Sequence, residues 1–195
     1  MKLLNRWRAA RNRLRTPETI AYHEAGHVVV AYEFGWFVGR GGVRLGQWPH
    51  VRTRYHESEY NLRARICVSL AGLLAEQKFH GLEWHLEEDV VEHLQAVRAG
   101  EDEGLYAGPS DLRKIALALL DDDPPISLAA TRGAVIYCQE YTEALLDDSR
   151  VWAGVERLAK ALHRRRYLSP RAIKRVLGDA FFGCAVQPPN GKPLR

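Results

Sequence analysis

Cysteine is scarce in this sequence, and its three copies (Cys67, Cys138 and Cys184) lie far apart. A disulfide framework needs more cysteines than this, and a cysteine zinc site needs closely spaced pairs. The sequence also lacks an apolar run of about 18 residues, which a transmembrane helix requires. Residues 1–15 are too basic to hold the apolar core of a secretion signal. We therefore expect a soluble, cytoplasmic protein.

The net charge of +4 is unevenly distributed along the chain. Residues 1–15 contain six Lys/Arg and no acid, so the rest of the chain sums to −2. The pI near 9.0 thus describes a basic N-terminal arm more than the body of the protein. This arm could attach to an anionic surface such as a membrane or nucleic acid, or to a partner protein, or it could be a solubilising extension.

Helix signals recur along the chain and predict a mainly α fold with one small β-sheet. A helix is expected from Pro17 to about Gly35, with Thr16 as its N-cap. Alternating residues around Pro49, within residues 36–57, predict a short β-hairpin. Further helices are expected over residues 61–79, within 83–103, and over about 108–120, 127–146, 150–163 and 170–178.

The chain length of 195 residues fits one main domain. We predict a basic arm over residues 1–15 and a domain over residues 16–180. Residues 181–195 are rich in Pro and Gly at their end and predict a disordered tail.

The segment His23-Glu24-Ala25-Gly26-His27 matches the H-E-x-x-H pattern of zinc peptidases. Its two histidines share one face of the predicted helix, about 6 Å apart along the axis, and can bind the same ion. Glu24 is rotated by about 100° from His23 and can take a proton from a water molecule at the metal. The alternative is a pair of histidines without a metal, but ionisable groups on a buried apolar helix are costly without compensation. The pattern therefore predicts a zinc site with Glu24 as general base.

The third ligand does not follow from this pattern alone. A metzincin would need Gly and His at the positions of Val30 and Glu33, so that class is excluded. Two carboxylates fit: Glu76, inside an apolar helix, and Asp111, in the first turn of a later helix. Five further histidines fall in predicted loops and are expected to be exposed to solvent; they are His50, His56, His80, His85 and His93.

The segments around these residues resemble the FtsH-type zinc metallopeptidases. Thr19-Ile-Ala-Tyr-His-Glu-Ala-Gly-His-Val-Val-Val-Ala31 is similar to the zinc helix of that family. Residues 69–81 are similar to its Gly-Gly-Arg-Ala-Ala-Glu-Glu helix, and Gly108-Pro-Ser-Asp-Leu112 is similar to its Gly-Ala-x-x-Asp-Leu segment. Residues 152–177 resemble its C-terminal helices, so the resemblance extends over about residues 16–178.

The resemblance implies a zincin-like FtsH peptidase domain with a defined set of site residues. His23, His27 and Asp111 would bind Zn²⁺, Glu24 would be the base, and Glu76 would orient a ligating histidine. Two positions depart from the family pattern: Ala71 replaces its first glycine and Leu73 its arginine. No Gly-x-x-x-x-Gly-Lys-Ser/Thr pattern occurs, so we expect a peptidase without the ATPase module and membrane anchor of the family.

Three functions are compatible with this sequence. The first is a zinc endopeptidase that cleaves flexible or unfolded polypeptides, with the substrate extended beside residues 43–55. The second is a catalytically idle, zinc-stabilised adaptor that binds a partner through the arm, although such a protein has no need of Glu24. The third is a nucleic-acid-linked regulator, which rests on the arm alone.

Overall fold

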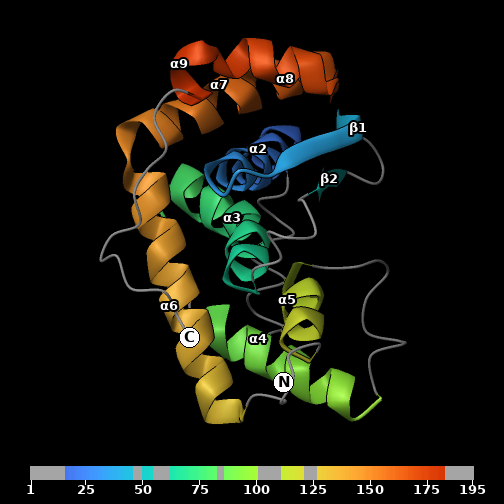
Figure 1. Ribbon diagram of the computed structural model, residues 1–195, viewed down its shortest axis with the longest axis vertical. Helices are drawn as coiled ribbons and strands as arrows, with labels where there is room; N and C mark the ends of the chain where they lie inside the picture. Colours follow the sequence, from blue (N-terminus) through green and yellow to red (C-terminus); the bar gives the residue numbers. More distant parts are fainter. Residues whose placement is uncertain are drawn as a thin grey trace.

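The computed structural model of this protein describes residues 16–45, 50–54, 62–82, 86–100, 111–120 and 127–182. Helices dominate the described part, and a small antiparallel sheet lies at its side (Figure 1). This architecture confirms the predicted mainly α fold with one small sheet. The predicted arm over residues 1–15 lies outside the described residues. No helix in the described ranges is long and apolar enough to span a membrane.

The predicted helices are present, and their caps are those that the sequence indicates. Thr16, Ser127 and Ser169 each accept a hydrogen bond from the backbone N–H three residues on, which satisfies a free donor of the first turn. The helices are α2 (Pro17–Glu33), α3 (Leu62–His80), α4 (Leu86–Arg98), α5 (Asp111–Leu120), α6 (Leu128–Asp147), α7 (Ser149–Arg165), α8 (Pro170–Leu177) and α9 (Asp179–Phe182).

Helices α2 and α3 form the centre of the fold. Helix α2 packs against α3 and α7, and α3 also packs against α5 and α6. The crossing of α2 and α3 is close at Gly26, where an added Cβ would lie 2.4 Å from the carbonyl oxygen of Ala71. Both helices are therefore buried over most of their length, which accounts for their apolar sequences.

The sheet has the strand order β2-β1-β3 and is antiparallel throughout. The predicted hairpin corresponds to β1 (Phe37–Arg44) and β2 (His50–Arg54), although the turn around Pro49 lies outside the described residues. Strand β3 (Tyr167–Leu168) was not predicted, because two residues are too short to show an alternating pattern. It pairs with the end of β1, where Gly42 adopts a φ of 66° and has no room for a side chain against the backbone of Leu168.

The C-terminal helices are attached to α2 by a partly buried ion pair. Both terminal nitrogens of Arg150 lie 2.8 Å from the carboxylate oxygens of Glu33, and one of them also donates to the carbonyl oxygen of Phe181. Phe181 is buried against Gly154 of α7. Phe181 and Phe182 thus end helix α9 instead of beginning the predicted tail, whose remaining residues lie outside the described ranges.

The prediction of solvent-exposed loop histidines was wrong for His93 and His80, which lie in helices, and His50 lies in a strand instead of a loop. His93 is buried on the inner face of α4, and its Nδ1 donates a hydrogen bond to the carbonyl oxygen of Asp89 at 2.7 Å. His80 belongs to the last turn of α3, with Nε2 3.0 Å from Oγ1 of Thr19. His50 lies in β2, and His56 and His85 lie outside the described residues.

Candidate metal centre

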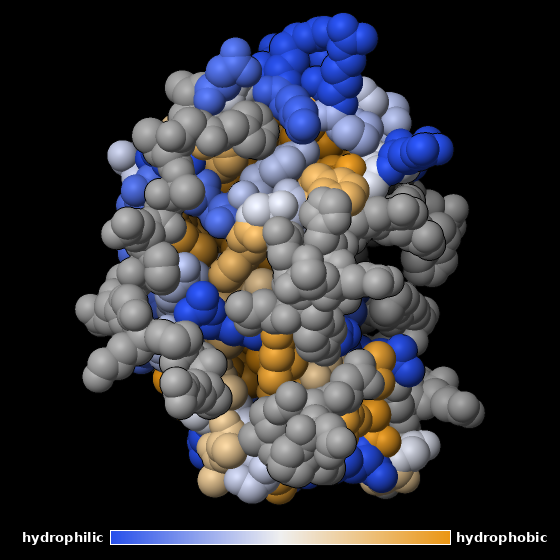
Figure 2. Space-filling view, in the orientation of Figure 1, coloured by the Kyte–Doolittle hydropathy of each residue, from blue (hydrophilic) through white to orange (hydrophobic). Residues whose placement is uncertain are grey.

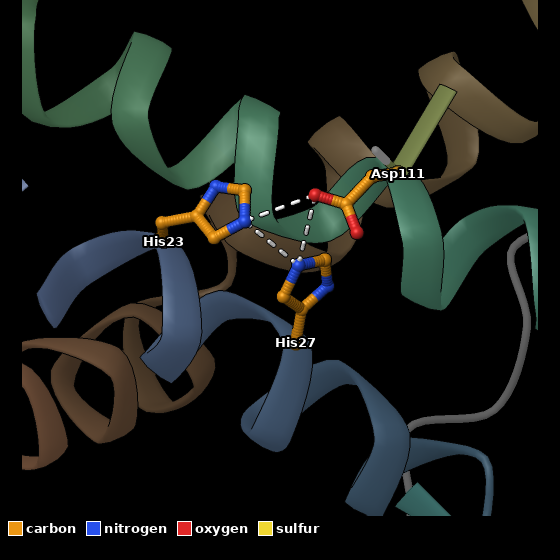
Figure 3. A group of neighbouring side chains, drawn as sticks. All are labelled: His23, His27 and Asp111. Atoms are coloured by element: carbon orange, nitrogen blue, oxygen red, sulfur yellow. Dashed lines mark hydrogen bonds and ion pairs between the residues drawn. The ribbon is translucent and has the colours of Figure 1, made fainter. Parts of the chain in front are cut away.

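Three predicted ligands from two helices meet at one point in the interior (Figure 3). His23 and His27 are one turn apart on α2, and Asp111 is the first residue of α5. Oδ2 of Asp111 lies 3.0 Å from Nε2 of His23 and 3.4 Å from Nε2 of His27. The two Nε2 atoms are 3.0 Å apart. The structure therefore contains a possible metal site formed by these three residues.

The outer nitrogen of each imidazole faces an acceptor. Nδ1 of His27 donates to the carbonyl oxygen of Val68 at 2.6 Å. Nδ1 of His23 lies 2.7 Å from Oε1 of Glu76, in ion-pair contact without the geometry of a straight hydrogen bond. A proton held on each Nδ1 leaves both Nε2 atoms with lone pairs directed at the point where they meet Asp111.

This arrangement fits a cation. Two imidazole nitrogens and a carboxylate oxygen are all acceptors, and such a cluster is repulsive in a buried place unless positive charge lies between its members. Ligand atoms about 2.0–2.1 Å from zinc in a tetrahedral site are separated by roughly 3.3 Å. The observed separations of 3.0–3.4 Å match that spacing.

The pKa values of the site residues without a metal also indicate a site that attracts positive charge. Burial favours the neutral imidazole, but the carboxylates of Glu76 and Asp111 outweigh it and raise the pKa of His23 from 6.5 to about 10. Burial also opposes ionisation of Asp111, yet His27 and His23 hold the pKa of this carboxyl well below its ordinary value of 3.8. The site therefore retains its anion and attracts positive charge, which is a proton when no metal is bound.

Glu24 lies next to this cluster on α2 and is buried. Burial raises the pKa of Glu24 above its ordinary value of 4.5, whereas the nearby His23 and His27 lower it by a smaller amount. Its carboxyl group is thus close enough to interact with both imidazoles. A carboxylate with a raised pKa is a better proton acceptor near neutral pH than an ordinary one.

Gly72 and Lys114 complete the site, and neither was predicted from the sequence. Gly72 of α3 faces the imidazoles: an added Cβ would lie 2.5 Å from Nε2 of His27 and 2.7 Å from Cε1 of His23. Lys114, one turn after Asp111 on α5, donates to Oδ1 of Asp111 at 2.8 Å. The sequence contained a sign of each role: Gly72 is a glycine inside an apolar helix, and Lys114 follows the Asp111 carboxylate by three residues.

All five site residues proposed from the sequence are within the described part of the chain. The structure brings His23, His27 and Asp111 together, and places Glu76 against His23 and Glu24 beside the cluster. Of the two carboxylates considered for the third ligand, Asp111 faces the Nε2 atoms and Glu76 faces a Nδ1 atom. A search of known protein families finds no match to this sequence, and a search of curated proteins finds none either.

Proposed function

We propose that this protein is a zinc-dependent metalloendopeptidase with the zincin-like fold of the FtsH-type peptidases. The observation that carries the proposal is the meeting of two Nε2 atoms and one carboxylate oxygen at tetrahedral ligand spacing, with Glu24 beside them. Two imidazoles and a carboxylate are a ligand set typical of catalytic zinc, which keeps its fourth position for water or substrate.

Zinc held by His23, His27 and Asp111 would act as a Lewis acid: it would polarise the peptide carbonyl and lower the pKa of a water molecule, so that this water can lose a proton and act as the nucleophile near neutral pH. Glu24 would take the proton of the attacking water and deliver it to the nitrogen of the departing amine. Its raised pKa suits both steps, because the proton must be accepted and then released. No other carboxyl group in the described residues combines burial on α2 with proximity to both imidazoles.

The remaining site residues would keep these groups in position. Glu76 fixes the ring of His23 through Nδ1, and the carbonyl oxygen of Val68 does the same for His27. Lys114 holds the second oxygen of Asp111, which directs Oδ2 toward the imidazoles. These contacts leave few alternative orientations for the three ligand atoms.

The proposed substrate is an extended, flexible polypeptide. Strand β2 (His50–Arg54) forms one edge of the described sheet and contacts α2, which carries the histidines. An extended chain could add to that edge through backbone hydrogen bonds, and its sequence would matter little to such pairing. Folded proteins would be poor substrates, since they present no free extended segment.

The experiment is to measure the metal content of the purified protein by mass spectrometry and its hydrolysis of casein with and without a chelator. We expect about one zinc per chain, loss of hydrolysis with the chelator and recovery after zinc is added back. Bound zinc without hydrolysis of any unfolded substrate would favour the idle adaptor. A protein that takes up no zinc would exclude both functions.

A further inference from the structure

The end of α7, strand β3 and the start of α8 form a second feature that the metal centre does not use. Residues 157–175 contain eight Lys/Arg and no Asp or Glu. Every one of these eight side chains is exposed, while the aliphatic side chains of Leu158, Leu162, Leu168 and Ile173 between them are buried. We call this surface the basic face; it comprises Arg157, Lys160, Arg164, Arg165, Arg166, Arg171, Lys174 and Arg175.

The basic face lies at one end of the molecule. Helix α8 packs against α7, β1 and β3, so the two helical parts of the face adjoin each other. In the view of Figure 2, strongly hydrophilic residues gather at the end where Figure 1 places α8. Arg44 of β1 adds a further exposed cation, with its guanidinium carbon 5.4 Å from the centre of the Tyr167 ring.

The charges of the basic face are not neutralised within the described part of the protein. Four cations elsewhere in the described residues pair with carboxylates; they are Lys78, Lys114, Arg132 and Arg150. In contrast, the described contacts of the basic face are to backbone carbonyl oxygens, from Arg157 to Leu177 and from Arg164 to Lys160. Like charges one turn apart destabilise a helix. The concentration of cations on the basic face therefore does not stabilise the fold and is better explained by binding of an anionic partner.

The helix dipole accounts for only some of these cations. Arg164 and Arg165 lie in the last turn of α7, and Lys174 and Arg175 lie in the last turn of α8; positive charge is favourable at both places. Arg171 lies in the first turn of α8, where it is unfavourable. Arg166 is more informative, because it adopts a left-handed conformation with φ of 62° that suits glycine or asparagine. Arg166 is also the C-cap of α7, where its positive charge is favourable, but its backbone conformation is more strained for arginine than for glycine.

We propose that the basic face binds single-stranded nucleic acid. Six of its eight cations are arginines, whose planar guanidinium groups bind phosphate oxygens in pairs. Tyr167 stands among them with an exposed ring and can stack on an unpaired base, as aromatic residues do in proteins that bind single strands. The face thus combines contacts to the backbone with one contact to a base.

An anionic membrane fits the same observations less well. Peripheral proteins strengthen their attachment by inserting aliphatic or aromatic side chains into the bilayer. Within residues 157–175, all of which the structure describes, Tyr167 is the only exposed large hydrophobic residue. An acidic protein partner would account for the charge but not for the tyrosine between arginines.

The main test is the binding of a fluorescent, mixed-sequence DNA strand of about 20 nucleotides to the full chain, measured by anisotropy at several salt concentrations. The variant Arg164→Gln/Arg171→Gln should bind at least tenfold more weakly, with a salt slope reduced by about 0.7 for each lost phosphate contact. The control Arg98→Gln/Arg132→Gln removes the same charge from α4 and α6. It should bind within about twofold of the wild type.

Two further variants separate the effects on DNA binding from other effects. Arg166→Gly separates loss of binding from loss of stability, and Tyr167→Leu separates contact with a base from attraction between charges. Arg166→Gly relieves the left-handed backbone, so its melting temperature should equal or exceed that of the wild type while its affinity for DNA falls. Tyr167→Leu should lose about fivefold or more in affinity for the DNA strand, because stacking on a base is lost. It should bind heparin, which has charge but no bases, as the wild type does.

Three results would overturn the proposal. One is binding that survives all of these substitutions and disappears on deletion of residues 1–15, because the arm would then be the binding site. Another is a Tyr167→Leu variant that loses heparin and DNA equally. The third is salt-sensitive binding to phosphatidylglycerol vesicles with none to DNA, which would assign the basic face to a membrane.

Discussion

The Nδ1 atom of His27 lies 2.6 Å from the carbonyl oxygen of Val68, a residue 41 positions further along the chain. In an α-helix this carbonyl also accepts from the backbone N–H four residues on, which is that of Gly72. The same turn of α3 therefore supplies the acceptor that orients the imidazole and the space in which the imidazole lies. The candidate metal centre therefore depends on the crossing of α2 and α3 as much as on His23, His27 and Asp111.

Replacement of Gly72 by alanine tests this dependence. The new Cβ would lie 2.5 Å from Nε2 of His27, so the ring must move. We expect a destabilisation of about 1–3 kcal/mol from overpacking and a zinc affinity lower by tenfold or more. Gly133→Ala is the matched control, because no atom lies within 4 Å of the added Cβ in α6. It should stabilise the protein by about 0.5–1 kcal/mol. Equal thermal denaturation curves and zinc titrations for both variants would contradict this interpretation.

The identity of the third ligand can be decided by zinc content. Asp111→Ala should lose zinc and all hydrolysis, because it removes the oxygen that faces both Nε2 atoms. Glu76→Gln should retain zinc with an affinity lower by about 10–100-fold, because it weakens a contact to Nδ1 of His23 and removes no ligand. A zinc-free Glu76→Gln beside a zinc-replete Asp111→Ala would reverse the assignment.

Glu24→Gln separates catalysis from metal binding. The amide cannot accept a proton, so casein hydrolysis should fall by a factor on the order of 10²–10⁴ while zinc content stays unchanged. Burial raises the pKa of Glu24, so the neutral amide should leave the melting temperature equal or higher. Glu18→Gln, an exposed change on the same helix, should keep full activity. Normal activity in Glu24→Gln would exclude the proposed general base.

The metal-free protein should lose stability as the pH rises from neutral to alkaline. The pKa of His23 is raised from 6.5 in the unfolded chain to about 10 in the folded one, so the folded state binds more protons between these values. The contribution of this residue is complete below about pH 6.5 and is lost as pH rises toward 10. Urea unfolding with a chelator at about pH 6, 8 and 9.5 measures this decline. His23→Gln should show a flatter profile, and a wild-type profile equally flat would contradict the assignment.

Zinc binding should displace that proton. Near pH 8 the ring of His23 is protonated in the metal-free site and must be neutral to bind a metal. Calorimetric titration with zinc in buffers of different ionisation enthalpy should therefore show the release of about one proton per site. Release of none would show that Nε2 of His23 carries no proton before the metal arrives.

Local signals were sufficient for much of the fold. Capping by Thr16 and Ser169, followed in each case by proline, located the starts of α2 and α8, because these effects act within one turn. Strand β3 and the buried position of His93 depend on contacts between distant segments, and the sequence gives no local sign of such contacts. The basic face was also not evident from the net charge. Residues 16–195 sum to −2, because acidic residues outside residues 157–175 offset its eight cations.

The candidate site was predictable to a similar extent. Spacing alone placed His23 and His27 on one face of a helix. The choice between Glu76 and Asp111 needed the placement of α5 against α3, which spacing does not give and which the family resemblance only suggested. Lys114 and the Val68 carbonyl were missed because their roles arise only when the helices are packed.

The close crossing at Gly26 and Gly72 also defines how distant relatives could be recognised. Gly26 is one of the two unspecified positions of H-E-x-x-H, yet an added Cβ there would meet the backbone of α3. The pattern in this chain is therefore better written H-E-x-G-H, followed by a glycine 45 positions after the second histidine. A search with both glycines and the later aspartate would select for the geometry of the crossing, which the motif alone does not encode.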